Sequence, residues 1–104
     1  MVVLCTAPDA ASAEKVARAL LEARAAACVN VIPGIRSLYW WKGAIQDDAE
    51  LLMVIKTRAP LLDSVEATIR GSHPYDVPEI LALPVRAGAA PYLDWLLAET
   101  TPTT

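Results

Sequence analysis

The sequence contains few of the residues from which metal and redox sites are usually built. It has one histidine and two cysteines. A single histidine excludes a Cys₂His₂ zinc site within one chain. The two cysteines lie far apart and form neither a disulfide framework nor a zinc-ribbon pattern. The net charge is −3, with no block of like charges, so we expect no nucleic-acid partner.

Long apolar segments are missing as well. The apolar run at residues 51–55 is far too short to span a bilayer. The N-terminus has no basic segment followed by a long apolar stretch, which a secretory signal requires. We therefore expect no membrane partner and a cytoplasmic location. The composition, 55% hydrophobic and 20% charged, is typical of a folded domain. It is apolar enough for part of the surface to be buried against other copies of the chain.

The order of predicted elements is strand, helix, strand, strand, helix, strand and a short last helix. Apolar and β-branched runs predict the strands, and apolar residues at helical spacing predict the helices. Asp9 and Ser12 are alternative caps for the first helix, Pro60 suits the first turn of the second, and Gly71 is expected to end it. The predicted ranges are 2–6, 10–26, 28–41, 50–57, 60–71, 80–85 and a helix from residue 91.

This βαββαβ order predicts an α+β fold, the ferredoxin-like sandwich. Right-handed crossovers place the first and third strands in the sheet centre. Pro33 and Pro84 fall in the second and fourth strands, which suits edge positions or a bulge because proline cannot donate to a ladder. We expect one domain over residues 1–99 and a flexible tail over residues 100–104.

The second and third strands form a long hairpin that turns at Lys42-Gly43. Its tip carries residues 38–41, Leu-Tyr-Trp-Trp, three of which are aromatic. Successive strand residues face opposite ways, so one sheet face cannot bury all of these rings. Ordinary core packing explains one or two of them. Self-association explains the exposed remainder better.

The only histidine lies in the segment at residues 73–79, His-Pro-Tyr-Asp-Val-Pro-Glu. One interpretation is structural, because a histidine just past a helix interacts favourably with the free carbonyls and prolines stop the helix. The other is functional. A neutral His73 imidazole would bind a metal or ligand, with Asp76 or Glu79 as an oxygen donor. The residues alone leave both interpretations open.

Two further positions have a structural and a functional interpretation. Cys28 is either a small buried hydrophobic residue or a thiolate ligand for copper or zinc. Residues 56–58, Lys-Thr-Arg, either bind an anion near the following helix or form a solvated strand end. Catalysis has little support, since no nucleophile motif or phosphate loop is present. His73 as a general base is the weakest hypothesis, and we expect no enzyme.

Several sequence blocks in a fixed order carry a family resemblance. They are Cys5–Asp9, 26–30 with 32–34, 37–43, Glu50 with 56–57, 73–79, and Gly88 with Tyr92 and Trp95. Together they resemble the CutA family of divalent-cation tolerance proteins over nearly the whole length.

This resemblance implies a homotrimer similar in plan to PII signalling proteins, with the hairpin reaching a neighbouring subunit. It implies tolerance to copper or another divalent cation, which would not be bound tightly. The implied metal contacts are Cys28, His73 and Glu79. The implied ligand-cleft residues are Asn30, Tyr39, Trp41, Glu50, Lys56 and Tyr75. The alternative is a PII-like regulatory module that binds a small anionic ligand through Lys56 in the inter-subunit cleft.

Overall fold

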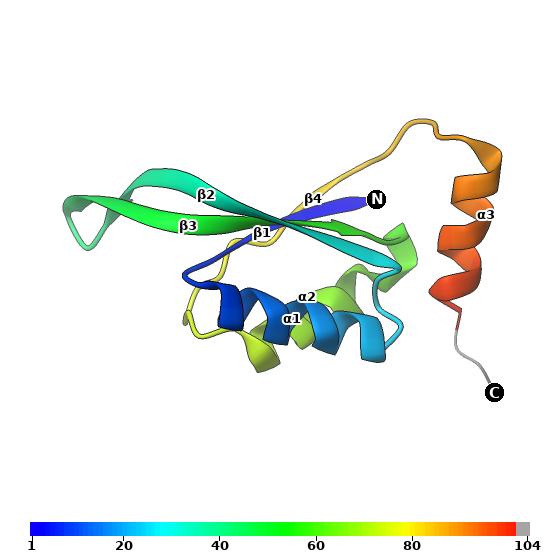
Figure 1. Cartoon of the computed structure of the whole chain (residues 1–104), viewed down its shortest axis with the longest axis horizontal. Coiled ribbons are helices and arrows are strands. Elements are labelled where there is room, and N and C mark those ends of the chain that lie inside the picture. Colours follow the sequence, from blue (N-terminus) through cyan, green and yellow to red (C-terminus); the bar gives the residue numbers. More distant parts are fainter. Residues whose placement is uncertain (102–104) are drawn as a thin grey trace.

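The chain folds as one antiparallel sheet with two helices packed on one of its faces (Figure 1). The computed structural model describes residues 1–101. The strand order is β2-β3-β1-β4, so β1 and β3 are central. This confirms the predicted ferredoxin-like α+β fold. The elements are β1 (Val2–Ala7), α1 (Ala10–Glu22), β2 (Cys28–Trp41), β3 (Ala44–Lys56), a 3₁₀ turn (Ala59–Leu61), α2 (Leu62–Ser72), β4 (Leu81–Leu83) and α3 (Ala90–Glu99).

The first helix is shorter than the predicted range of 10–26. It begins with Asp9 as its cap, since the Ser12 backbone N–H donates to Asp9 Oδ1 at 2.7 Å. It ends at Glu22 because Arg24 adopts a left-handed conformation with φ of 55°. The Ala25 N–H then donates to the Leu20 carbonyl at 3.0 Å. This bond satisfies a free helical carbonyl and turns the chain toward β2.

Other predicted boundaries are wrong for local reasons. The third strand is Ala44–Lys56 rather than 50–57, because its pairing with β2 continues up to the hairpin turn. Gly71 does not end the second helix, which continues to Ser72 and is followed by His73 in an extended conformation. The fourth strand is only Leu81–Leu83 rather than 80–85. Pro84, which has no N–H to donate, follows directly after it.

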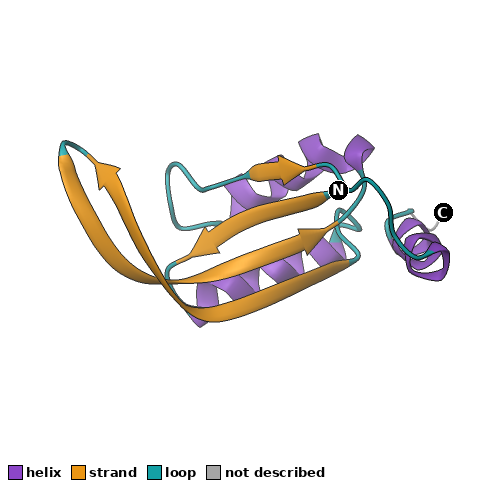
Figure 2. Cartoon of the chain, turned by 90° about the horizontal axis from the view of Figure 1, so that it is seen from above, coloured by secondary structure: helices purple, strands orange, loops and turns teal. Residues whose placement is uncertain are grey.

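The long hairpin leaves the sheet and forms a projecting arm (Figure 2). The β2–β3 register shifts between Ile32 and Ile35, so Pro33-Gly34 forms the expected bulge. The hairpin turns at Lys42-Gly43, where both residues have positive φ, 50° and 80°. We call residues 35–50 the hairpin arm. It contributes to the elongated shape of 46 × 27 × 21 Å.

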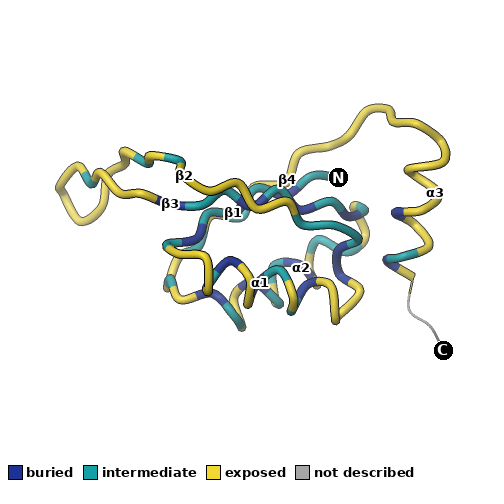
Figure 3. The backbone as a smooth tube through the Cα atoms, viewed as in Figure 1, coloured by how far each residue is buried: buried dark blue, intermediate teal, exposed yellow. Residues whose placement is uncertain are grey.

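The hydrophobic core lies between the sheet and the two helices (Figure 3). Its fully buried side chains include Val3, Cys5, Met53 and Ile55 from the sheet, with Val16, Leu20, Val65 and Ile69 from the helices. The opposite sheet face has no cover from α1 or α2. Leu81, Leu83 and Ile32 on that face and its edges remain exposed. We call this second face the open face.

The last helix is attached mainly through its C-terminal end. Arg58 donates from Nε to Thr100 Oγ1 and from Nη2 to the Thr100 carbonyl, each at 3.0 Å. Thr100 is fully buried, so the predicted flexible tail cannot begin at this residue. Residues 102–104 of that tail lie outside the described part of the chain. In residues 1–101, none of the helices is both long and apolar enough to cross a membrane.

Candidate functional site

The imidazole of His73 is held by the backbone on both sides. His73 Nε2 lies 2.7 Å from the Thr6 carbonyl, and the Tyr75 N–H donates to His73 Nδ1 at 3.0 Å. This pattern assigns the proton to Nε2 and leaves Nδ1 as an acceptor. His73 is also only 8% exposed. The ring therefore ties the segment after α2 to the end of β1. We call residues 73–79 the His73 loop.

These contacts do not fit the metal set of Cys28, His73 and Glu79 within one chain. A metal would need a free ring nitrogen, and both nitrogens of His73 are occupied. Cys28 lies far away, because it pairs with Lys56, which also pairs with Val2 at the start of β1. Thr6 lies roughly 13 Å further along that strand. Across residues 1–101, no group of three or more His, Cys, Asp or Glu side chains could hold a metal ion.

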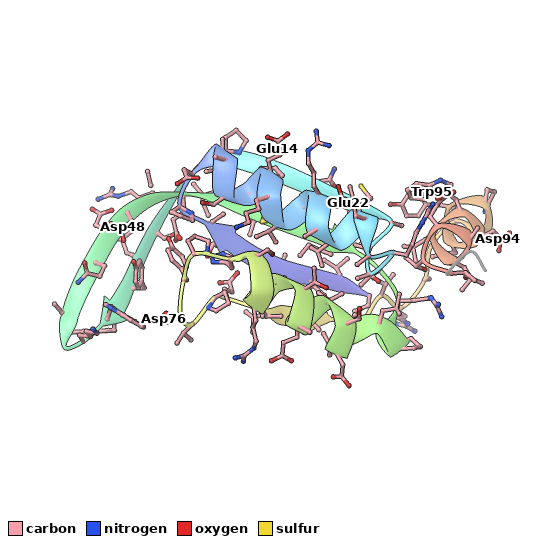
Figure 4. All side chains as sticks on the ribbon, turned by 90° about the horizontal axis from the view of Figure 1, so that it is seen from below. Glu14, Glu22, Asp48, Asp76, Asp94 and Trp95 are labelled. Carbon is pink, nitrogen blue, oxygen red and sulfur yellow. The ribbon has the colours of Figure 1, made fainter. Side chains whose placement is uncertain are left out.

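A cleft of about 740 Å³ separates the hairpin arm from the His73 loop. We call it the arm cleft. Figure 4 shows Asp48 on the arm and Asp76 on the loop at the same end of the molecule. The lining residues come from the end of β1, from both strands of the arm and from the loop. They are Thr6, Arg36, Ser37, Leu38, Tyr39, Trp41, Glu50, Pro74, Tyr75, Asp76, Val77 and Glu79.

Four of the six predicted cleft residues meet here: Tyr39, Trp41, Glu50 and Tyr75. Asn30 and Lys56 do not line the cleft of a single chain. Both lie on the sheet side of the bulge, and Lys56 pairs with Cys28 at the far end of the hairpin. Counting strand pairs back from the Lys42-Gly43 turn would have shown from the sequence that Asn30 and Lys56 lie far from the arm.

Two tyrosine–carboxylate hydrogen bonds organise the cleft. The Tyr75 hydroxyl donates to Glu50 Oε2 at 2.8 Å, and Glu50 is only 6% exposed. The Tyr39 hydroxyl donates to Asp48. Burial, followed by the bond to Glu50, raises the pKa of Tyr75. The bond to Asp48 is the main reason that the pKa of Tyr39 is also raised. Both phenols therefore stay protonated and donate at neutral pH.

The cleft carries an excess of negative charge. Glu50, Asp76 and Glu79 line it, and Arg36 is the only Lys or Arg among the described lining residues. Arg36 is neutralised, because Nε and Nη2 donate to the two oxygens of Asp47 at 2.8 and 2.6 Å. Sequence reasoning missed Arg36, whose pairing depends on the register of the arm.

The thiol of Cys5 is buried in the core near two of these charges. Burial first, then the charges of Glu79 and Glu50, raise the pKa of Cys5 to about 12. Glu50 and Glu79 line the same cleft as Thr6, so both lie near the end of β1, although distant segments supply them. Cys5 itself is a protonated core side chain, as its place in an apolar strand predicts.

The predicted anion site at residues 56–58 is already used for packing. The Thr57 hydroxyl donates to the Ala25 carbonyl at 2.6 Å, and Arg58 is bound to Thr100. The functional interpretation of this segment is therefore wrong for Thr57 and Arg58. The PII-like alternative places Lys56 in a cleft between subunits, so it stays a prediction; within one chain Lys56 does not line the arm cleft.

Comparison with known proteins identifies the family. The sequence model of the CutA1 divalent ion tolerance protein matches residues 1–99. The chain belongs to the CutA1 family. A crystal structure of CutA1 from Oryza sativa superposes with a TM-score of 0.93 at 44% identity, covering 98% of this chain and 94% of that one.

Curated relatives of different lengths share this domain. The divalent-cation tolerance protein CutA of Pectobacterium atrosepticum is 47% identical over 94% of this chain and 89% of its own length. Protein CutA 1, chloroplastic, of Oryza sativa is 45% identical over 96% of this chain but only 56% of its own length. The chain thus spans little more than half of the plant relative and most of the bacterial one.

Proposed function

We propose that this protein acts in tolerance to copper or similar divalent cations by binding the cation loosely, as a homotrimer and without catalysis. The match to the CutA1 family over residues 1–99 carries the proposal. The geometry of His73 argues against catalysis by this residue. His73, the only histidine, is buried with both ring nitrogens occupied, which leaves it unable to take a proton from a substrate without breaking a bond.

The metal site in this proposal is shared between copies of the chain. One chain keeps Cys28 apart from His73 and Glu79, and its described residues assemble no complete ligand set. Cys28 lies on the open face, since its neighbour Val29 pairs with the core residue Ile55 and successive strand residues face opposite ways. A site completed only by a second copy is consistent with modest affinity.

Exposed apolar surface supports the trimer. Leu38 is 61% exposed, Trp40 71% and Ile45 63%, and these three side chains lie on one face of the hairpin arm. The open face adds Ile32, Leu81 and Leu83. Large apolar side chains exposed together on a strand are typical of an association surface. The trimeric stoichiometry itself comes from the family resemblance.

The cytoplasm is the compartment that we propose. Both cysteines are free thiols, which suits a reducing compartment. The rice relative is named as chloroplastic, so location varies among related proteins. Cell fractionation with an antibody against this chain tests the assignment, and recovery in a periplasmic or organelle fraction would contradict it.

Copper titration by calorimetry, combined with light scattering, tests the function. We expect wild type to bind copper as a trimer and Cys28→Ala to bind it more weakly. The matched control is Cys5→Ala, which removes the other thiol from the core and should leave copper binding unchanged. Copper affinity that is equal in Cys28→Ala and wild type would refute the shared thiol site. A monomer at micromolar concentration would refute the trimer.

A further inference from the structure

Glu50 is the only buried carboxylate in residues 1–101. It is 6% exposed and makes no ion pair with any group of this part of the chain. Oε2 accepts the bond from Tyr75, while no described group donates to Oε1. A charge this buried is costly unless an opposite charge is bound beside it. A single chain therefore leaves Glu50 without the cation that would compensate its burial.

Most cations of the chain already have partners. All nine Lys and Arg residues lie within residues 1–101. Four arginines form ion pairs with carboxylates, and Arg58 binds Thr100. The four that remain are Lys15, Lys42, Lys56 and Arg86. Three of these side chains are exposed, and only Lys56 is partly buried. Lys56 is thus the one cation that is both withdrawn from solvent and without a carboxylate in the described chain.

Glu50 and Lys56 lie on the same side of β3 but far apart along it. Met53 and Ile55 point into the core, so the alternation of strand residues places both charges on the side of the open face. Glu50 lies beside the bulge, where the arm begins, and Lys56 is the last residue of the strand. The distance along the strand is roughly 20 Å. The two charges therefore cannot meet within one chain.

A closed ring of identical copies can bring these different ends together. In such a ring each copy presents two different surfaces, one to each neighbour. Between the two charges, β3 places Leu52 and Val54 on the open-face side, and both are only partly buried. The strand thus presents a carboxylate, two apolar side chains and an ammonium group in order. Packing this surface against a neighbour buries the apolar side chains and leaves each charge in need of a partner.

We propose that Lys56 of a neighbouring copy enters the arm cleft and pairs with Glu50, so that each copy gives one cation and receives one. This inference rests on the homotrimer of the proposed function and names a contact that closes it. The ammonium group lies beside Glu50 Oε1, while Tyr75 keeps its bond to Oε2. The buried charge is then compensated only in the assembled protein. A small anion that binds Lys56 would have to displace this carboxylate.

Neutral variants of the two residues test the pair. Glu50→Gln keeps an acceptor for Tyr75 but leaves the neighbour's ammonium group uncompensated, and Lys56→Met leaves Glu50 uncompensated. Removing one partner of a buried pair is far more costly than replacing both. We expect each single variant to raise the concentration at which the trimer dissociates by about a hundred-fold. The double variant should recover about ten-fold or more of that loss. Light scattering over a dilution series measures all three.

Matched controls and a chemical cross-link locate the contact. Glu14→Gln and Lys15→Met on α1 remove the same charges from exposed positions and should leave assembly unchanged. In the unaltered protein, a carbodiimide should join the Glu50 carboxylate to the Lys56 amine, with loss of water, and mass spectrometry identifies the joined peptides. Because the two residues are far apart in one chain, this product should migrate as more than one chain on a denaturing gel. Coupling of Lys56 to a different carboxylate instead would overturn the pair.

The outcomes separate this pair from the proposed function. A monomeric wild type overturns the trimer and the pair together. A trimeric wild type with additive losses in the double variant, or with unchanged assembly in Lys56→Met, overturns the pair alone. If Glu50→Gln unfolds, as circular dichroism would show, Lys56→Met and the cross-link decide the matter. Cys28→Ala should lower copper affinity without changing assembly, so the copper site can fail while the pair stands.

Discussion

The two ends of the β2–β3 hairpin have the same strand geometry, but one end is covered by helices and the other is exposed. Near the helices, β3 places Met53 and Ile55 in the core, where both are fully buried. In the arm, the same strand places Ile45 in an exposed position. Strand pairing continues through both regions, with Val29 opposite Ile55 and Trp40 opposite Ile45. Backbone pairing alone therefore does not create a core.

The difference separates stability from binding in this molecule. Burial of apolar side chains against α1 and α2 supplies the main stabilising term of the fold. The arm has few buried side chains, yet it brings Tyr39, Trp41 and Glu50 to the cleft. Apolar surface left on the arm is available to another copy of the chain. The part of the sheet that α1 and α2 cover, which we call the covered region, should therefore control unfolding. The hairpin arm should control binding and assembly.

Truncating one isoleucine at each end of β3 should show the largest contrast. Ile55→Ala creates a cavity in the core and should lower the free energy of unfolding by about 3 kcal/mol. Ile45→Ala, at 63% exposure, should cost less than about 1 kcal/mol in a dissociated chain. Urea unfolding measures both. Similar losses of unfolding free energy for the two variants in dissociated chains would contradict the comparison. If Ile45→Ala weakens assembly instead, light scattering would show a smaller mass.

The His73 loop joins the two regions and should show an intermediate effect. His73→Ala removes a buried ring with hydrogen bonds to Thr6 and Tyr75, and should cost about 2 kcal/mol. Asp76→Ala in the same loop removes an exposed side chain and should cost less than about 0.5 kcal/mol. Denaturant unfolding gives both values. Equal losses would mean that the His73 bonds contribute no net stability.

The covered region was the more predictable of the two, because its signals are local. An apolar, β-branched run was sufficient to place β1, and helical spacing was sufficient to place α1 and α2. The strand order followed from connection handedness. The Pro33 bulge and the Lys42-Gly43 turn also follow from backbone chemistry. The end of α1 was missed because Arg24, a residue without the freedom of glycine, takes the left-handed conformation.

The cleft was only partly predictable, because its contacts join distant segments. Tyr75 and Glu50 were singled out by resemblance, but no local pattern indicates that their side chains meet. The state of His73 depends on the Thr6 carbonyl, which only the folded sheet brings near. The separation of Cys28 from His73 depends on strand register. Residue type and the family resemblance together suggested a metal site that the described residues of one chain do not assemble.

Two glycines allow a smaller test of backbone strain in the two regions. Gly43 in the arm has φ of 80°, so Gly43→Ala should destabilise by about 1 kcal/mol. Gly71 lies in α2, and an added Cβ would meet no atom within 4 Å. Gly71→Ala should therefore stabilise by about 0.5–1 kcal/mol. Thermal unfolding measures the two signs, and equal signs would contradict the backbone argument.

Thiol labelling should distinguish the two faces of the sheet without changing stability. Only the thiolate reacts rapidly. Burial and nearby carboxylates raise the pKa of Cys5 to about 12, so at pH 8 it is almost entirely protonated and shielded in the core. Cys28 is partly exposed on the open face. We expect iodoacetamide to label one thiol per native chain at pH 8 and two in denaturant, with native Cys28→Ser unlabelled. Labelling of native Cys28→Ser would mean that Cys5 becomes accessible in the folded chain, and this would contradict its burial in the core.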